Sequence, residues 1–430
     1  MRKKLRLLVG ILLFLAILYL GHFKAQELLP ARQFDVQGAN LAALVLEPTC
    51  DLAEQIEKAK QLLVASPPLE IIERSRRGKN ARGKYYTTYT TEKRQIGLAI
   101  LSTKTCDISE ERYWLEEDEI EQGNFLRKTH QDNPGNIPKF MPVDPQNDLM
   151  VIVNWWNNHN SELTVVENGS VNAEDYIVIG NKFLLPNGNI AYPDEITGPR
   201  YSDIVYVPYS EPIHTEDMVG KGFDFMNQSV DEVAKELDDL GIESRAYPGK
   251  LVTEMITPRL VKEILLIEHI DPTRVFASSD NGRKLAERIF VRYAFNGDRA
   301  FRYTFSRTDA AGAGQIMPGT YGTVPGAYPK ANLIKDVDIG RADFKNGLKA
   351  TFLILDMKLF EIEAKVQTSS KARKIWAAKT LDEKQEAVAA SYNGGSTKYK
   401  HLTGNISLAV RETVDFVRKF KMIRELELFD

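Results

Sequence analysis

The chain has 430 residues, of which 43% are hydrophobic and 27% are charged, and its formal net charge is −3. This composition excludes a disordered or low-complexity chain, and the length allows two or three domains with a sizeable core. The two cysteines, Cys50 and Cys106, are too few for a zinc site, so they form either one disulfide or two free thiols.

The first segment, residues 1–24, has the pattern of a signal anchor. Four basic residues precede an uncharged, mostly apolar run from Leu7 to Phe23. No small-x-small cleavage site follows, which favours an uncleaved transmembrane helix over a cleaved signal peptide. The positive-inside rule then predicts a single-pass protein of the inner (cytoplasmic) membrane, with the bulk of the chain in the periplasm.

Residues 25–132 are predicted to be a mainly helical region of unknown role. One helix is expected to begin at the N-cap Asp51, and an acidic, Glu-rich pattern predicts another over Ser109–Leu126. Nothing in this region indicates chemistry, so it is interpreted as a scaffold or a partner surface.

Residues 133–250 are predicted to be a β-rich module that begins with a proline-rich loop. The pair Asn187-Gly188 predicts a hairpin turn. Runs of β-branched and aromatic residues predict four further strands, at Leu149–Trp155, Glu162–Val166, Tyr176–Ile179 and Ile204–Val207.

Residues 251–430 are predicted to be mainly helical, which makes the whole chain an α+β multidomain protein. This region holds 29 Lys and Arg against 22 Asp and Glu. A basic balance suits an anionic polymer such as a cell wall, although scattered solvated charges give the same count. Helices are expected at Arg259–Glu268, Asp280–Phe295, Val337–Lys365, Asp382–Ser391 and Ser407–Leu428.

The stretch from Ser306 to Tyr321 has a composition suited to binding. Ala310 to Gly314 carry almost no side chain, which lets backbone approach a ligand closely. Gln315 follows with an amide that both donates and accepts hydrogen bonds. Together these residues predict a wall for an extended polar ligand.

This stretch resembles the Gly-Leu-Met-Gln-Ile-Met-Pro-x-Thr signature of the soluble lytic transglycosylase (SLT) family, a branch of the lysozyme-like superfamily. Ala313 and Gly314 replace the usual Leu and Met, and Asp309 stands where a Gly is usual. A second block, Ala389–Gly395, is similar to the family's Ala-Ala-Tyr-Asn-Ala-Gly. The resemblance implies a lysozyme-like domain within residues 251–430. The matching residues are Gly312, Gln315, Ile316, Met317, Pro318 and Thr320.

Cleavage of a glycosidic bond needs a carboxylic acid that is still protonated near neutral pH, and burial among apolar groups raises the pKa of a Glu for this purpose. Glu268 follows the apolar run Ile264–Ile267, where the family has its catalytic Glu at a helix end. Glu268 and Ser306 are 38 residues apart, whereas the family usually has about ten between these positions. The helix between them offers a rival acid, Glu287.

The resemblance implies a peptidoglycan lytic transglycosylase that cleaves the β-1,4 bond between N-acetylmuramic acid and N-acetylglucosamine. Glu268 would act first as acid and then as base, with help from the substrate's N-acetyl group, and would leave 1,6-anhydro ends. The residues implied to bind substrate are Ser306, Gln315, Met317, Tyr392 and Asn393.

Expected partners are peptidoglycan strands, the membrane through the N-terminal helix, and envelope proteins. No cofactor, metal or nucleic acid is expected, because the six histidines are scattered and we recognise no phosphate loop and no basic ribbon interleaved with aromatics. Two alternatives stay open. One is a muramidase-type hydrolase, which needs a second carboxylate. The other is a catalytically inert glycan-binding scaffold in an envelope assembly.

Overall fold

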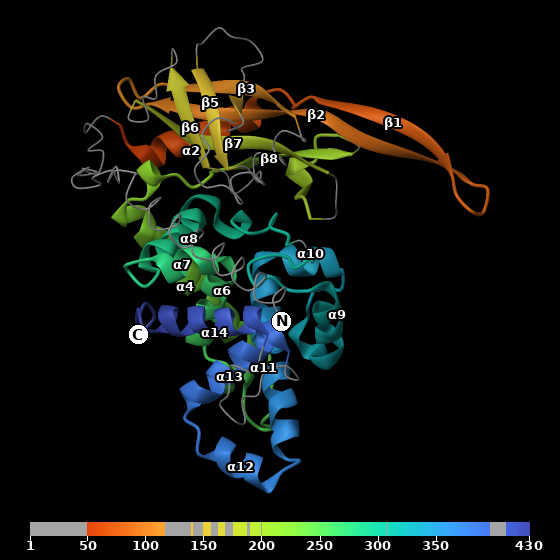
Figure 1. Ribbon diagram of the computed structural model, residues 1–430, viewed down its shortest axis with the longest axis vertical. Coiled ribbons are helices and arrows are strands. Elements are labelled where there is room, and N and C mark those ends of the chain that lie inside the picture. The colour runs from red at the N-terminus through yellow and green to blue at the C-terminus, as the bar shows by residue number, and fades with distance from the viewer. Residues whose placement is uncertain are drawn as a thin grey trace, which may run out of the picture. The chain divides into compact units, whose positions relative to one another are not determined.

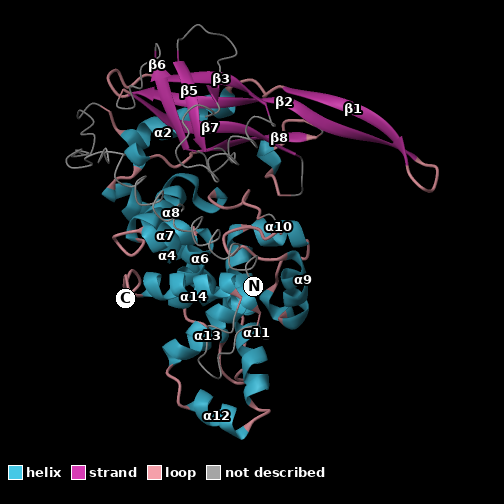
Figure 2. Cartoon of the chain, in the orientation of Figure 1, coloured by secondary structure: helices cyan, strands magenta, loops and turns pink. Residues whose placement is uncertain are grey.

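The chain combines a sheet region with a helical region, as the α+β prediction requires (Figures 1 and 2). No helix within the described ranges is long and apolar enough to cross a bilayer. The anchor predicted over residues 1–24 lies outside those ranges. The computed structural model describes residues 50–116, 139–140, 149–155, 162–167, 175–186, 190–198, 200–306, 308–395 and 410–430.

The sheet region contains two antiparallel sheets. In the larger sheet the strand order is β1-β2-β7-β8, and β3 also pairs with β2. The smaller sheet has the order β4-β5-β6. The strands are β1 (Ile71–Lys79), β2 (Tyr85–Ser102), β3 (Ile108–Glu116), β4 (Lys139–Phe140), β5 (Leu149–Trp155), β6 (Glu162–Glu167), β7 (Tyr176–Pro186) and β8 (Tyr201–Tyr206).

Both faces of the C-terminal half of β2 are covered. Side chains alternate along the strand, so each face meets a different layer. Ala99 and Leu101 of β2 pack with the apolar stripe of helix α2 (Leu52–Ala65). Leu98 and Ile100 point the other way and pack with Val151 and Val165 of the smaller sheet. The C-terminal half of β2 is therefore buried between a helix and a second sheet.

The prediction of a mainly helical region over residues 25–132 is wrong for most of its described part. Helix α2 begins after its N-cap Asp51 as predicted, because the carboxylate accepts from the backbone N–H groups of Ala53 and Glu54. The helix expected over Ser109–Leu126 is instead strand β3 up to Glu116. Glu111, Tyr113 and Leu115 are buried while the residues between them are not, and this period of two is typical of a strand.

The predicted β-rich module is confirmed in its strands but not in its bounds. Strands β5 to β8 lie within a few residues of their predicted positions. The larger sheet also takes in β1 to β3, so the boundary expected near residue 133 falls between strands of one sheet. The Asn187-Gly188 turn lies outside the described residues, and Ile190–Tyr192 does not form the second strand of a hairpin.

Cys50 and Cys106 form a disulfide, with their Cα atoms 5.7 Å apart. The bridge ties the residue before α2 to the turn between β2 and β3. It settles the choice that the sequence left open between a bridge and two free thiols.

The helical region begins at residue 216, before the predicted boundary at 250. Helix α4 packs closely on α8, since a Cβ on Gly222 would lie 1.7 Å from the Phe290 carbonyl oxygen. The longer helices are α4 (Glu216–Asp239), α6 (Pro258–His269), α8 (Arg283–Asn296), α9 (Pro318–Ala327), α11 (Phe344–Val366), α13 (Leu381–Gly394) and α14 (Arg411–Arg424). The shorter ones are α5 (Val252–Met255), α7 (Pro272–Ala277), α10 (Val337–Ala342) and α12 (Ser370–Ala377).

The helices predicted in this region are confirmed with one division. The single helix expected over Val337–Lys365 is broken into α10 and α11 at Asp343, whose extended backbone and side chain cap the start of α11. Helix α6 lies at the centre of the region, with every residue from Leu260 to Ile267 buried. It packs against α4, α8, α11 and α14.

Candidate active site

Helix α6 places Glu268 in its last turn, at the edge of the buried core. The Thr257 hydroxyl caps the start of the helix and Pro258 occupies its first position, which both favour a helix beginning there. Ile264, Leu265, Leu266 and Ile267 are fully buried, whereas Glu268 itself is only partly buried. The glutamate is therefore surrounded by apolar residues yet not sealed off.

These surroundings keep Glu268 protonated near neutral pH. Burial raises its pKa from 4.5 to about 8, against the opposing positive charge of Lys419, and the negative charge of Glu412 adds a further increase. Within the described part of the chain, the Glu268 carboxyl group forms no hydrogen bond or ion pair. The Lys419 ammonium instead donates to the carbonyl oxygens of Ile267 and Ile270, the latter at 2.8 Å.

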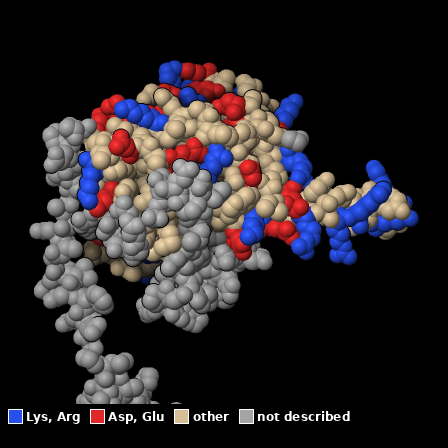
Figure 3. Space-filling model, turned by 90° about the horizontal axis from the view of Figure 1, so that it is seen from above, with Lys and Arg blue, Asp and Glu red and all other residues tan. Residues whose placement is uncertain are grey.

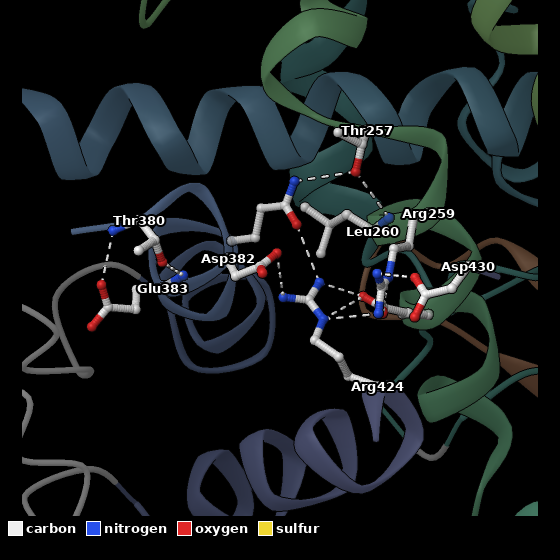
Figure 4. Close-up of polar contacts among 10 residues, drawn as sticks. Thr257, Arg259, Leu260, Thr380, Asp382, Glu383, Arg424 and Asp430 are labelled. Atoms are coloured by element: carbon white, nitrogen blue, oxygen red, sulfur yellow. Dashed lines mark hydrogen bonds and ion pairs between the residues drawn. The ribbon is translucent and has the colours of Figure 1, made fainter. Parts of the chain in front are cut away.

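The other glutamate of α6, Glu263, has a contrasting environment. Its side chain is buried and accepts two hydrogen bonds of 3.0 Å, one each from the guanidinium groups of Arg259 and Arg424. Figure 4 shows Arg424 reaching between α13 and α6, with Asp382 on one side, and Arg259 beside Asp430. Glu263 thus forms structural ion pairs with both arginines.

The loop from Thr304 to Pro318, which carries the first motif, depends on glycines. Gly312 has φ of +73°, and a Cβ there would lie 2.0 Å from the Arg341 carbonyl oxygen. A Cβ on Gly314 would lie 2.5 Å from the Thr351 hydroxyl oxygen and 3.2 Å from that of Tyr392. These two positions need glycine, because the loop passes directly over α10 and α11.

Buried Arg341 of α10 holds the two ends of this loop together. Its guanidinium donates to the carbonyl oxygens of Asp309 and Ile316, and it pairs with the Asp338 carboxylate at 2.6 Å. Asp309, which stands where the SLT signature has a Gly, takes a left-handed backbone with φ of +67°. Asp tolerates this conformation better than most residues, so the substitution preserves a turn that Gly would also form.

Two predicted substrate-binding residues, Ser306 and Gln315, use their side chains to shape the loop. The Ser306 hydroxyl accepts from the backbone N–H of Ala310 at 2.9 Å. The Gln315 amide donates to the Gly312 carbonyl oxygen at 2.9 Å. Met317, a third predicted residue, is 41% exposed. The hydrogen bonds that the structure describes for these side chains stay within the loop, and none reaches Glu268.

The second motif meets the first through Tyr392, in the last turn of α13. Its hydroxyl donates to the Gly314 carbonyl oxygen at 2.6 Å. Burial and the negative charge of Glu268 together raise the pKa of Tyr392, so Tyr392 and Glu268 are electrostatic neighbours. Asn393 follows and is partly buried.

His269, the residue after Glu268, also contacts the loop. Its Nε2 lies 2.8 Å from the Ala313 carbonyl oxygen, so this nitrogen carries the proton and donates. The ring stacks on Phe301 with centroids 3.7 Å apart. Successive carbonyl groups, those of Ala313 and Gly314, therefore accept hydrogen bonds from residues of α6 and α13, which brings three separate sequence segments together.

The rival acid Glu287 and the nearby carboxylate of Asp271 have other partners. Glu287 of α8 lies 3.1 Å from His214, whose other ring nitrogen meets the Tyr209 hydroxyl at 2.7 Å. Asp271 caps helix α7 by accepting from the backbone N–H of Arg274. Sequence reasoning found Glu268 but not Lys419, Arg341 or Thr351, because no local pattern marks a residue whose role depends on distant packing.

In the ranges that the structure describes, no three His, Cys, Asp or Glu residues gather in a group that could hold a metal ion. Comparison with known proteins adds no family: no family model, curated protein or solved structure matches the chain. The functional interpretation therefore depends on the geometry of α6, α13 and the loop.

Proposed function

We propose that the helical region is a lysozyme-like lytic transglycosylase that cleaves the bond between N-acetylmuramic acid and N-acetylglucosamine in peptidoglycan. The observation that carries this proposal is the protonated, partly buried Glu268 at the meeting point of two motif segments. A carboxyl with a pKa of about 8 is mostly a proton donor at neutral pH, which the first step of glycosidic cleavage requires.

In the proposed mechanism, Glu268 gives its proton to the glycosidic oxygen as the bond to muramic C1 breaks. The substrate's N-acetyl oxygen stabilises the positive charge that develops at C1. Glu268, now a carboxylate, takes the proton of the muramic C6 hydroxyl, and that oxygen closes on C1 to give the 1,6-anhydro product. One carboxyl group serves both steps by microscopic reversibility.

The remaining predicted residues have positioning roles in this proposal. The Tyr392 hydroxyl is already occupied by the Gly314 carbonyl, so Tyr392 fixes the loop beside Glu268. Exposed Met317 and partly buried Asn393 remain available to a glycan. Ser306 and Gln315 maintain the conformation of the loop that presents Met317.

The test is product analysis of purified peptidoglycan digested by the full chain. Mass spectrometry should find anhydro-muramic ends, and Glu268→Gln should release none. Reducing ends in place of anhydro ends would show a hydrolase. Wild-type protein that sediments with peptidoglycan but releases nothing would show an inert scaffold.

The hydrolase alternative has one specific observation in its favour. Glu412, in the first turn of α14, is exposed and its charge reaches Glu268. In such a hydrolase Glu412 would activate a water molecule as the general base of an inverting site, or attack C1 as the nucleophile of a retaining site. Under this alternative, Glu412→Gln would abolish the release of reducing ends, whereas a transglycosylase with Glu412→Gln keeps forming anhydro ends.

We also propose that the chain is anchored in the inner membrane by residues 1–24 and faces the periplasm, where envelope proteins are available as partners. The Cys50–Cys106 disulfide supports this location, because disulfides persist in oxidising compartments and are rare in the cytosol. Thiol labelling of denatured protein taken directly from cells would test it: two labelled cysteines without prior reduction would contradict the proposal.

A further inference from the structure

The N-terminal half of β2 and its partner β1 form a two-stranded ribbon, which we call the arm (residues 74–91). In the described ranges, β3 pairs with β2 only from Lys93 onward and β7 only from Gly97 onward. From Tyr85 to Glu92, β2 therefore has β1 as its one partner strand. The arm extends beyond the rest of the sheet (Figures 1 and 2).

The arm has a composition unlike that of a core-forming hairpin. It contains six Lys and Arg residues and no Asp or Glu. Tyr85, Tyr86 and Tyr89 are each at least 50% exposed. An isolated two-stranded ribbon is marginally stable by itself, and these side chains bury no core. Figure 3 shows Lys and Arg without Asp or Glu toward the end of this ribbon.

Strand pairing sorts these side chains onto two faces. Lys79 pairs with Tyr85, Arg77 with Thr87, and Ser75 with Tyr89. Directly paired residues share a face, so this face, which we call the ladder face, carries both cations and two tyrosines. Arg76 lies on the opposite face, where the Tyr86 ring covers Gly78.

On the ladder face, cations and aromatic rings alternate in contact. The Arg77 guanidinium lies 4.5 Å and the Lys79 ammonium 5.3 Å from the centroid of the Tyr85 ring. Arg200, at the base of the arm, lies 3.9 Å from the centroid of Tyr89. These cation–π contacts hold the rings and charges in a fixed row on an exposed surface. The sequence prediction of no basic ribbon interleaved with aromatics is therefore wrong.

We propose that the ladder face binds an anionic polysaccharide. The cations can pair with carboxylate or phosphate groups along the polymer, and the exposed parts of the tyrosine rings that the cations leave uncovered can pack against the C–H groups of the sugars. This site lies on different elements from Glu268, so the inference goes beyond the proposed glycosidic cleavage and does not require it.

Two observations favour a polysaccharide over other polyanions. The Cys50–Cys106 disulfide indicates an oxidising compartment, where nucleic acid is not the usual polymer. The tip of the arm, residues 80–84, has the sequence Asn-Ala-Arg-Gly-Lys and offers no large apolar side chain to insert into a lipid bilayer. Nucleic acid and anionic lipid are the two alternative ligands that the experiment must exclude.

The experiment measures binding of the full chain to polygalacturonate, a polymer with one carboxylate on each sugar, by fluorescence anisotropy. Dextran supplies a neutral control, and single-stranded DNA and phosphatidylglycerol vesicles represent the rivals. Work at about 0.15 M salt limits charge effects to about 8 Å. We expect binding to polygalacturonate, little binding to dextran, and weaker binding to DNA of the same charge.

Adjacent arginines provide a matched pair of variants. Arg77→Ser and Arg76→Ser each remove one exposed guanidinium from β1, but from opposite faces. Arg77→Ser should weaken binding to polygalacturonate roughly two- to fivefold, while Arg76→Ser should change it less than about twofold. Tyr85→Thr keeps strand propensity and should weaken binding about as much as Arg77→Ser, since it removes the ring between two cations.

Equal losses from Arg77→Ser and Arg76→Ser would overturn the proposal, because the face would then not matter. So would DNA binding tighter than polygalacturonate binding, or a loss from Arg77→Ser that appears with vesicles and not with polygalacturonate. Circular dichroism checks that each variant stays folded. Glu268→Gln should bind polygalacturonate as the wild type does, which separates this inference from the catalytic proposal.

Discussion

Helix α6 carries two glutamates five residues apart, Glu263 in its middle and Glu268 in its last turn, with opposite chemistry. Glu263 is buried and paired with Arg259 and Arg424, whereas Glu268 is less buried and has a raised pKa. The deeper carboxylate is thus the structural one, because guanidinium groups compensate its charge. The comparison shows that pairing, more than depth, decides whether a carboxyl group is fixed as an anion or kept as an acid.

The largest effect should come from Glu268→Gln, which keeps the size of the side chain but removes its titratable proton. We expect cleavage of peptidoglycan to fall by roughly 10²–10⁴-fold while the fold is retained. Release of soluble muropeptides measures this. Glu263→Gln, assayed well below its melting temperature, is the control on the same helix and should keep most of the activity.

For stability we expect the larger loss from Glu263→Gln rather than from Glu268→Gln. Glu263→Gln leaves the guanidinium groups of Arg259 and Arg424 close together without their shared anion. Because both guanidinium groups are partly exposed and keep Asp430 and Asp382 as partners, we expect a loss of about 1–3 kcal/mol, measurable by urea denaturation. A loss below about 1 kcal/mol would mean that the ion pairs of Glu263 do not stabilise the fold. The two glutamates would then not differ as described.

The pH dependence of the unfolding free energy should report the raised pKa of Glu268. The pKa of Glu268 is raised on folding from 4.5 to about 8, so the stabilising effect of its neutral form is complete below about pH 4.5 and is lost as pH rises through about 8. Each pH unit between these values removes up to ~1.4 kcal/mol of unfolding free energy.

Glu268→Gln should therefore gain stability relative to the wild type between pH 5 and pH 8. Wild type and variant should be compared only up to about pH 8. Burial also lowers the pKa of neighbouring Lys419, so at higher pH this second group would contribute to the pH dependence. A difference in unfolding free energy between variant and wild type that stays constant from pH 5 to pH 8 would contradict the raised pKa of Glu268.

A smaller effect is expected from Gly314→Ala. The new Cβ would approach the hydroxyl oxygens of Thr351 and Tyr392 and displace the loop from Tyr392. We expect activity to fall by roughly tenfold, since misplacement of about 1 Å can cost up to about a hundredfold. Gly319→Ala is the matched control, because a Cβ there has no neighbour within 4 Å, and it should retain full activity.

The smallest effect should come from Glu287→Gln. This change removes the carboxylate that faces His214, an interaction at a partly exposed site worth up to about 1 kcal/mol. Cleavage should stay within about twofold of the wild type. Loss of activity here with retention in Glu268→Gln would transfer the role of acid to Glu287.

The sequence singled out Glu268 and Tyr392 as candidates because each lies in a local pattern, an apolar run before a helix-end glutamate and a recognisable block. The structure shows that Glu268 is electrostatically close to Tyr392, while their catalytic roles stay a prediction. Lys419 and Arg341 could not be singled out from the sequence, since each donates to carbonyl groups of a distant segment.

The arm was missed for a different reason. The Tyr and Thr residues over 85–91 favour a strand, but the whole of residues 25–132 was predicted to be mainly helical. Antiparallel pairing of this part of β2 with β1 forms the arm. An exposed strand that faces no core has no regular pattern of hydrophobic residues to reveal it in the sequence, whereas buried helix α6 has one.

The most direct test of the central claim is a titration of Glu268 itself. Carbon-13 NMR of protein labelled at the glutamate side-chain carboxyls would follow each signal with pH, and the Glu268→Gln variant would assign the one that disappears. The account predicts that this signal titrates near pH 8. Titration near the ordinary glutamate value of about 4.3 would contradict it, because the group would then be a carboxylate at neutral pH and could not donate the first proton.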